Sequence, residues 1–172
     1  MNTTAETDIE SLDPGNREQI IRAVRETLKA NNPGILSTVD RDGFPQSRWM
    51  ATMSFSDFPD LYTLTAATSR KVSQIQTNPL VQWMFFNEAL TFVVNLTGRA
   101  QLFLHEAEAM KRIWGQIADR SRAYFLTSPA GGAGFVIIHT KVEKIECTIP
   151  RKVLRFSVDP AEVSDGFQSA QN

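Results

Sequence analysis

The feature that most constrains the fold is the shortness of the connections between stretches of alternating apolar and polar residues. Residues 35–39 predict a strand, residues 40–43 a tight turn, and residues 47–55 a second strand with clear alternation. A further turn at residues 56–60 leads directly into a third strand at 61–66. Connections this short cannot carry a parallel crossover, so the three strands are expected to form an antiparallel meander.

The rest of the chain adds helices and more strands to this meander. Apolar residues at helical spacing predict helices over residues 14–30, 69–77 and 106–124. Three further strands are predicted over residues 80–86, 90–104 and 135–147. Gly98 is expected to mark a bulge or bend in the longest of them. The chain is therefore expected to be mainly β (α+β), and six antiparallel strands usually close into a small barrel that removes exposed edges.

The length and composition indicate a single folded domain. The chain has 172 residues, within the roughly 100–200 residues of one domain. Hydrophobic residues make up 42% and charged residues 22%, which is ordinary globular usage and argues against wholesale disorder. Residues 1–13 and 159–172 are polar and are predicted to be flexible tails. A single folded domain is therefore predicted over residues 14–158, between the two tails.

The composition also excludes several classes of function. A net charge of −1 excludes a generally basic nucleic-acid-binding protein. The single cysteine, Cys147, excludes an internal disulfide, and with only His105 and His139 no metal centre is predicted. His139 lies on a predicted strand and is interpreted as structural. No apolar run reaches the ~18–20 residues that span a bilayer, and no signal peptide is present, so we expect a cytoplasmic protein without a membrane partner.

The segment that carries chemistry is residues 64–71, where a strand ends and two cations occupy the first turn of a helix. Cations are electrostatically misplaced there, because the helix dipole already puts positive charge at that end. Free backbone N–H groups, the Ser69 hydroxyl, Arg70 and Lys71 would together suit a phosphate dianion. Arg48, on the preceding strand, could be brought beside them by an antiparallel neighbour. The alternatives are a solvated charged turn and, for Arg48, an ordinary outward-facing strand residue.

These segments resemble a known family. Residues 34–48 resemble the opening hairpin of the pyridoxamine 5′-phosphate oxidase-like split-barrel flavoproteins. Residues 65–71, followed by Asn78-Pro79 and a strand, resemble that family's phosphate-binding unit, and residues 97–100 the strand after it. The resemblance covers roughly residues 17–147 in order. It implies a six-stranded antiparallel split β-barrel with flanking helices.

The resemblance also implies FMN bound at the interface of a homodimer. By position, the FMN phosphate would be held by Arg48, Ser69, Arg70 and Lys71. Thr65 would contact the phosphate–ribityl region, and the strand containing Trp49 and Met50 would run beside the isoalloxazine. A phosphate charge near −2 needs several charge-assisted donors, and a flat ring needs an apolar slot, so the residue types agree with this implication.

Two departures separate the chain from the oxidase proper. The oxidase engages its pyridoxal substrate through a C-terminal Arg/His pair, but the chain after Cys147 offers only Arg151, Lys152 and Arg155. A flavin-approaching glutamine of the oxidase is replaced near Phe92-Val93. The predicted helix over 106–124 and the lack of a long C-terminal substrate segment look most like the general-stress-protein branch. Recognition of the vitamin substrate is therefore not expected.

The resulting functional prediction is an FMN-dependent oxidoreductase of this family, in which a hydride passes from NAD(P)H or a small reduced substrate to the flavin. No catalytic side chain can be assigned, because the chemistry would be the cofactor's. Two alternatives use the same phosphate site: a flavin-binding stress protein without turnover, and a deazaflavin-dependent reductase. The sequence leaves the substrate, the electron donor and the occurrence of turnover open.

Overall fold

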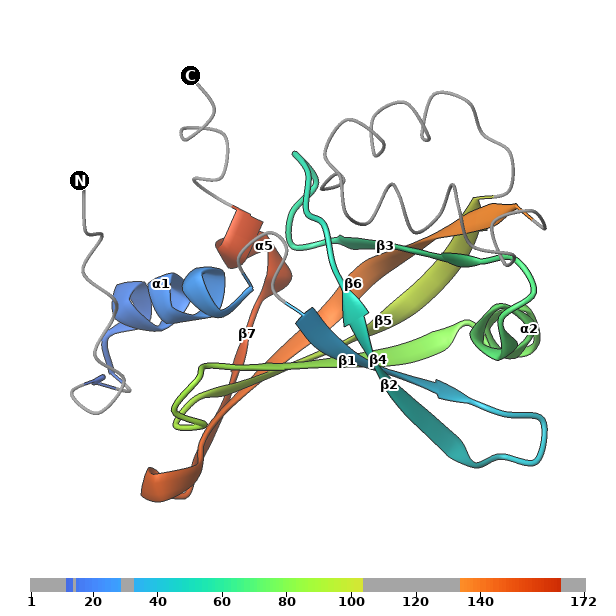
Figure 1. Cartoon of the computed structure of the whole chain (residues 1–172). Helices are drawn as coiled ribbons and strands as arrows, with labels where there is room; N and C mark the ends of the chain where they lie inside the picture. The colour runs from blue at the N-terminus through green and yellow to red at the C-terminus, as the bar shows by residue number, and fades with distance from the viewer. Residues whose placement is uncertain (1–11, 14, 29–32, 104–133, 165–172) are drawn as a thin grey trace.

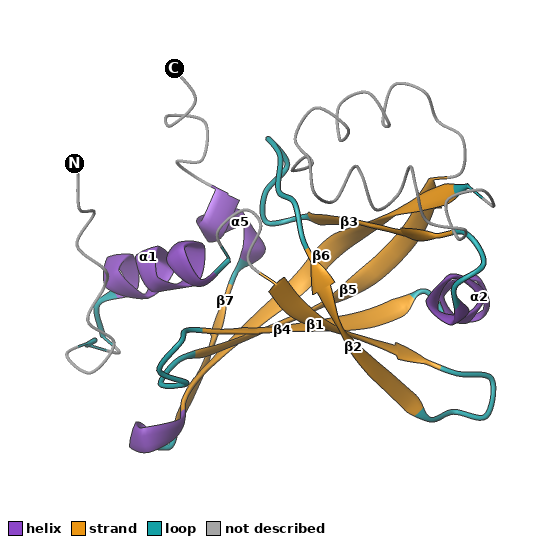
Figure 2. Ribbon diagram, viewed as in Figure 1, coloured by secondary structure: helices purple, strands orange, loops and turns teal. Residues whose placement is uncertain are grey.

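The computed structural model describes residues 12–13, 15–28, 33–103 and 134–164. In this part of the chain a single curled sheet forms the body of the molecule, with short helices at its ends (Figures 1 and 2). Its strands are, in chain order, β1 (Pro33–Val39), β2 (Pro45–Ala51), β3 (Leu61–Ala66), β4 (Leu80–Phe86), β5 (Val93–Phe103), β6 (Phe135–Ile149) and β7 (Leu154–Val158). The helices are α1 (Arg17–Thr27), α2 (Arg70–Thr77) and α5 (Pro160–Ser164), with one 3-10 turn at Pro150–Lys152.

Every strand pair in the sheet is antiparallel, as the short connections predict. The strand order is β2-β1-β4-β5-β6-β3, with β7 added beside β6. The two outer strands of this path, β2 and β3, are brought together where Met53, just after β2, forms an isolated bridge with Tyr62 of β3. Two backbone hydrogen bonds of 2.8 and 2.9 Å make this bridge. The sheet therefore curls into a barrel that is only partly closed, and the split-barrel fold class is confirmed.

The curl is centred on the long pair β5–β6. The register of this pair shifts between Thr97 and Gly98, which is the β-bulge predicted at Gly98. An added Cβ at Gly98 would lie 2.0 Å from the carbonyl oxygen of Lys141 on β6. Only a residue without a side chain allows the two backbones to approach this closely.

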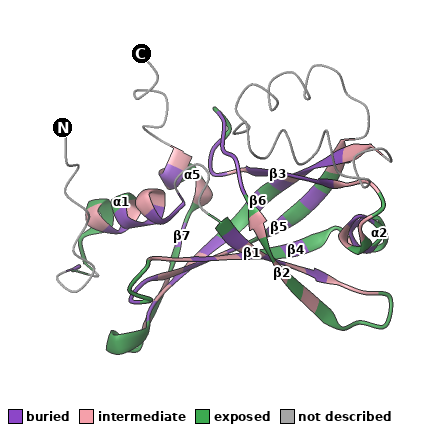
Figure 3. Cartoon of the chain, in the orientation of Figure 1, coloured by how far each residue is buried: buried purple, intermediate pink, exposed green. Residues whose placement is uncertain are grey.

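Alternation along the strands separates a buried face from an exposed one (Figure 3). Large side chains that are almost fully buried come from β1, β4, β5, β6 and the residue just before β5: Leu36, Trp83, Phe85, Leu96, Ile145 and Phe92. One buried polar contact orders this core, because the Trp83 indole N–H donates to the Thr140 hydroxyl at 3.0 Å. The barrel interior is thus filled by its own side chains, and any bulky ligand must bind outside it.

The ends of the described chain pack against each other at one end of the sheet (Figure 1). Arg17 of α1 forms an ion pair with Glu162 of α5, and Arg25 donates to the backbone oxygen of Val163 at 2.8 Å. Leu12 and Val163, both inside the predicted tails, are buried in the main core. Apolar burial thus extends the folded unit beyond residues 14–158, and the remainder of both tails lies outside the described residues.

Several sequence predictions shift at their boundaries. Asn16, instead of Asp13, caps α1 by accepting a hydrogen bond from the Gln19 backbone at 3.1 Å. The predicted strand over 90–104 begins only at Val93, because the turn before it places Leu90 at a positive φ. β7 is an additional seventh strand. The predicted helix over residues 106–124 lies outside the described residues. None of the described helices is long and apolar enough to cross a bilayer.

Gly98→Ala tests the close approach of β5 and β6. The new Cβ would collide with backbone atoms that cannot rotate away, so we expect the free energy of unfolding to fall by about 1–3 kcal/mol. The measurement is urea-induced unfolding. Thr97→Ala, at the exposed neighbouring position, is the control and should change stability by less than about 0.5 kcal/mol. Equal stability of Gly98→Ala and wild type would contradict the bulge geometry.

Cys147 is the only cysteine of the chain and is fully buried on β6. Burial raises the pKa of its thiol to about 12, with Arg17 nearby acting in the opposite direction. The reactive thiolate is therefore about one part in ten thousand at pH 8. The thiol acts as a small apolar core group.

We expect Cys147 in the native protein to resist alkylation by iodoacetamide at pH 8, and to react fully once the protein is unfolded in urea. Mass spectrometry after timed exposure measures both rates. Native labelling as fast as that of the unfolded chain would contradict the buried position of the thiol.

Candidate functional site

The residues predicted to bind a phosphate come from three segments that meet at the end of the sheet where α2 lies (Figure 2). β3 ends at Ala66, a short turn follows, and Ser69 precedes the first residue of α2. The Ser69 backbone N–H donates to the Ala66 oxygen at 3.0 Å, which tightens this turn. Arg48 reaches the same place from β2. The curled sheet thus brings together residues that are more than twenty positions apart.

Arg48 is held by oxygens of β1 and α2. Its Nη1 donates to the Thr38 hydroxyl at 2.7 Å and to the Leu36 backbone oxygen at 3.3 Å. Its Nη2 donates to Oε1 of Gln74 at 3.1 Å. All three acceptors are neutral. They therefore orient the guanidinium group but supply no negative charge to balance its positive charge.

Lys71 and Ser69 meet at Thr65. The Lys71 ammonium donates to the Thr65 hydroxyl at 2.9 Å, and the hydroxyls of Thr65 and Ser69 lie 3.1 Å apart. The Ser69 side chain makes no hydrogen bond to the first turn of α2, and this turn contains no acidic residue. Arg70 is exposed beside them and makes no ion pair with any described residue.

The electrostatics of this cation cluster (Arg48, Arg70 and Lys71) are unfavourable in the protein alone. Burial and then the positive charge of Arg70 lower the pKa of Arg48. Burial and then the charge of Arg48 lower the pKa of Lys71. No carboxylate among the described residues pairs with any of the three. Cations that lower one another's pKa values without a carboxylate partner are typical of a functional site, and their charge suits an anion.

The other two predicted residues lie on β2 but on opposite faces. Met50 is half-buried and packs against the main core, on the same face as Arg48. The Trp49 side chain points to the other face, is 58% exposed and contacts Phe86 edge to face with ring centroids 5.6 Å apart. The structure therefore brings together five of the seven predicted residues, places Met50 nearby, and directs the Trp49 side chain away from the cluster.

Two residues of the site were missed by the sequence reasoning, Thr38 and Gln74. Both are buried polar residues, and a hydrogen bond of 2.6 Å joins them. Thr38 stands in an alternating strand and Gln74 in an amphipathic helix, so neither position is unusual in the sequence. The sequence did contain one signal for Gln74: this polar residue stands next to Ile75, on the side of a short helix that faces the core.

The cations near the end of the chain serve structural contacts. Lys152 donates to the Leu12 backbone oxygen at 3.1 Å, and Arg155 lies 3.6 Å from a carboxylate oxygen of Glu146. Both cations therefore interact with other parts of the fold.

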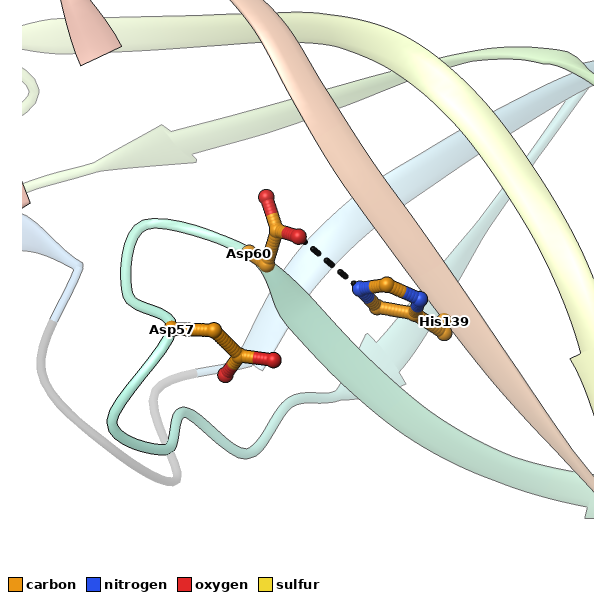
Figure 4. Close-up of side chains that lie close together, drawn as sticks. All are labelled: Asp57, Asp60 and His139. Carbon is orange, nitrogen blue, oxygen red and sulfur yellow. Dashed lines mark hydrogen bonds and ion pairs between the residues drawn. The ribbon is translucent and has the colours of Figure 1, made fainter. Parts of the chain in front are cut away.

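A second polar cluster joins two aspartates that precede β3, Asp57 and Asp60, to His139 of β6 (Figure 4). The Nε2–H of His139 donates to a carboxylate oxygen of Asp60 at 2.9 Å, and the His139 ring is stacked between Tyr62 and Phe103. The Tyr62 hydroxyl donates to Asp57, and one ligand atom from each of Asp57, Asp60 and His139 lies within 4.8 Å of the others. Because these hydrogen bonds already join the side chains to one another, we interpret the cluster as a structural network.

Comparison with known proteins identifies relatives of this chain. A family model described as pyridoxamine 5′-phosphate oxidase matches residues 20–148. No curated protein matches the sequence.

Solved structures share the fold. A protein related to general stress protein 26, from Clostridium acetobutylicum, aligns with a TM-score of 0.70 and 14% identity, covering 85% of this chain and 98% of that one. A pyridoxamine 5′-phosphate oxidase-related, FMN binding protein from Nostoc punctiforme gives a TM-score of 0.63 and 19% identity, over 87% and 97% of the two chains. An F420 reductase gives 0.52 and 20% identity, over 70% and 94%.

Lys71→Met tests whether repulsion within the cation cluster destabilises the protein when no anion is bound. Removing a half-buried charge that repels Arg48 should raise the free energy of unfolding by up to about 1 kcal/mol, despite the lost hydrogen bond to Thr65. The measurement is urea unfolding in chloride buffer free of phosphate and flavin. Lys141→Met, at an exposed position of β6, is the control and should have no effect. A loss of more than about 1 kcal/mol in Lys71→Met would contradict this view.

Proposed function

Because the chain belongs to the pyridoxamine 5′-phosphate oxidase family, we propose that it binds FMN, with the phosphate at the cation cluster and Ser69. The observation that carries the proposal is the meeting of Arg48, Arg70 and Lys71 without a described carboxylate partner. A phosphate dianion supplies the missing negative charge, and the positive end of α2 adds to the attraction.

The donors of this site match the acceptors of a phosphate group. Lys71 uses only one of its three N–H donors on Thr65, and Arg70 donates to no described residue. The first backbone N–H groups of α2 have no partner inside the helix. Ser69 adds a hydroxyl. Several charge-assisted hydrogen bonds to three phosphate oxygens are therefore available, and Thr65 would contact the ribityl chain next to the phosphate.

We further propose that the protein is a flavin-dependent oxidoreductase, with NAD(P)H or a small reduced substrate as electron donor. When bound, FMN would supply the hydride-accepting ring. The chain would contribute position: its side chains hold the phosphate, and β2, with the backbone of Trp49 and Met50, lies along an open edge of the sheet. The filled barrel interior leaves the ring outside the barrel.

A homodimer would cover this ring. Two large apolar side chains support the proposal: Phe44 (66% exposed), just before β2, and Trp49 (58%), on β2. Exposed apolar groups gathered in one region are typical of an interface. A second subunit docked there would shield both these side chains and the flavin from water.

The structural neighbours suggest two alternative functions. The neighbour from Clostridium acetobutylicum is related to a general stress protein, and another neighbour is an F420 reductase. The alternatives are therefore a flavin-binding stress protein without turnover and a deazaflavin-dependent reductase. Both would use the same cation cluster for phosphate.

Replacing Arg70 and Lys71 together by Ala should weaken FMN binding far more than riboflavin binding, because only FMN carries the phosphate. With about 1.5–3 kcal/mol for each hydrogen bond to a charged group, the FMN dissociation constant should rise at least tenfold to a hundredfold. Quenching of flavin fluorescence measures both ligands. The matched control is Arg41→Ala with Lys144→Ala, which removes two exposed cations from other parts of the fold. Equal losses for FMN and riboflavin would mean that the phosphate binds elsewhere.

Anaerobic mixing of the FMN-loaded protein with NADH or NADPH tests turnover. We expect bleaching of the visible flavin absorbance at a rate that rises with nucleotide concentration, because a reduced flavin loses this absorbance band. The same experiment with F420 in place of FMN distinguishes the two cofactors. Flavin that binds but stays oxidised with every donor would favour the stress-protein alternative.

A further inference from the structure

We propose that Thr38 and Gln74 are positioning residues, which hold the Arg48 guanidinium by one edge so that its other edge is presented to the phosphate. This inference rests on the proposed FMN site and adds to it two residues that touch neither phosphate nor flavin. It is carried by a closed set of hydrogen bonds between β1, β2 and α2.

The three side chains form a ring of hydrogen bonds. Nη1 of Arg48 lies 2.7 Å from the Thr38 hydroxyl, and Nη2 lies 3.1 Å from Oε1 of Gln74. The ring is closed by the 2.6 Å contact between the Thr38 hydroxyl and the same Gln74 oxygen. Thr38 is 1% exposed and Gln74 is 9% exposed, so water does not compete freely for these groups.

The chemistry of the groups allows only one direction for each bond. Arg48 has donors alone, so both oxygens must accept from it. The Thr38 hydroxyl then has its proton available for the Gln74 oxygen. A flipped Gln74 amide would turn its own N–H donors toward those of Arg48, which is repulsive. The amide orientation is therefore determined by its partners, and the ring has a single arrangement.

This ring occupies one edge of the guanidinium. The oxygens of Thr38 and Gln74 lie 2.6 Å apart, a separation that suits the parallel donors of Nη1 and Nη2 at the end of the group. The remaining Nη1 hydrogen points to the Leu36 backbone oxygen. Of the five N–H donors, Nε–H and the second Nη2–H are left, and no described residue accepts from them. They lie side by side, which is the fork that binds two oxygens of a phosphate.

The ring also sets the position of Arg48 relative to the rest of the cation cluster. Gln74 belongs to the same helix as Arg70 and Lys71, one turn further along α2. Its bonds to Thr38 and Arg48 tie this helix to β1 and β2. The ring therefore holds Arg48 within electrostatic reach of Arg70 and Lys71, although their like charges repel one another.

Three variants test the positioning role, with the ratio of the riboflavin to the FMN dissociation constant as readout. Thr38→Val removes the hydroxyl at nearly constant volume, and Gln74→Met removes the acceptor at similar length. Each should lower the ratio about tenfold, since Arg48 then loses its orientation, while riboflavin affinity stays unchanged. Thr38→Ser keeps the hydroxyl and should retain the wild-type ratio. Thermal unfolding reports stability separately.

Thr140→Val is the matched control. It removes another buried threonine hydroxyl, the acceptor of the Trp83 indole, and should lower stability without changing the ratio. If Thr38→Val and Gln74→Met keep the ratio within twofold of wild type, or lower both affinities equally, the positioning role is overturned.

Arg48→Ala distinguishes this failure from a failure of the proposed function. A reduced ratio in Arg48→Ala, together with wild-type ratios in Thr38→Val and Gln74→Met, leaves the phosphate site standing and refutes the positioning pair. A wild-type ratio in Arg48→Ala, or no FMN binding by the wild-type protein, refutes both. Should Gln74→Met fail to fold, the contrast between Thr38→Val and Thr38→Ser decides the question.

Discussion

The pairing of β5 with β6 is the interaction on which the rest of the structure depends. These are the two longest strands, and every other strand reaches the sheet directly or indirectly through them: β4 and then β1 and β2 beside β5, and β3 and β7 beside β6. The bulge at Gly98 lets the pair bend, because two backbones meet where no side chain would fit. The bent pair curls the sheet until β2 and β3 meet.

The candidate site is a consequence of this curl. Arg48 on β2 and the turn that follows β3 belong to opposite ends of the strand order, and they become neighbours only because the sheet closes on itself. The like charges gathered there are partly buried, which lowers the pKa of both Arg48 and Lys71. The fold tolerates this cost because neutral oxygens of Thr38, Gln74 and Thr65 hold the cations in place. A bound anion would offset the repulsion between these cations through charge-assisted hydrogen bonds.

The family relationship and the site chemistry support different parts of the interpretation. The family model shows membership, and the solved neighbours, all below 25% identity, show the fold. The cation cluster supports a phosphate-bearing ligand. The region after β6 has a structural role: Lys152 interacts with Leu12, Arg155 interacts with Glu146, and these contacts stabilise the fold.

The sequence by itself determined the local features: the antiparallel strands, the bulge at Gly98, and a turn and helix start with cations at residues 64–71. Each follows from neighbours along the chain, through alternation, short connections and helix electrostatics. Only the tertiary structure decided that Arg48 joins Lys71, that Thr38 and Gln74 orient Arg48, and that Leu12 and Val163 enter the core. Those contacts depend on sheet curvature and strand register, which bring distant residues within hydrogen-bonding distance and leave no periodic trace in the sequence.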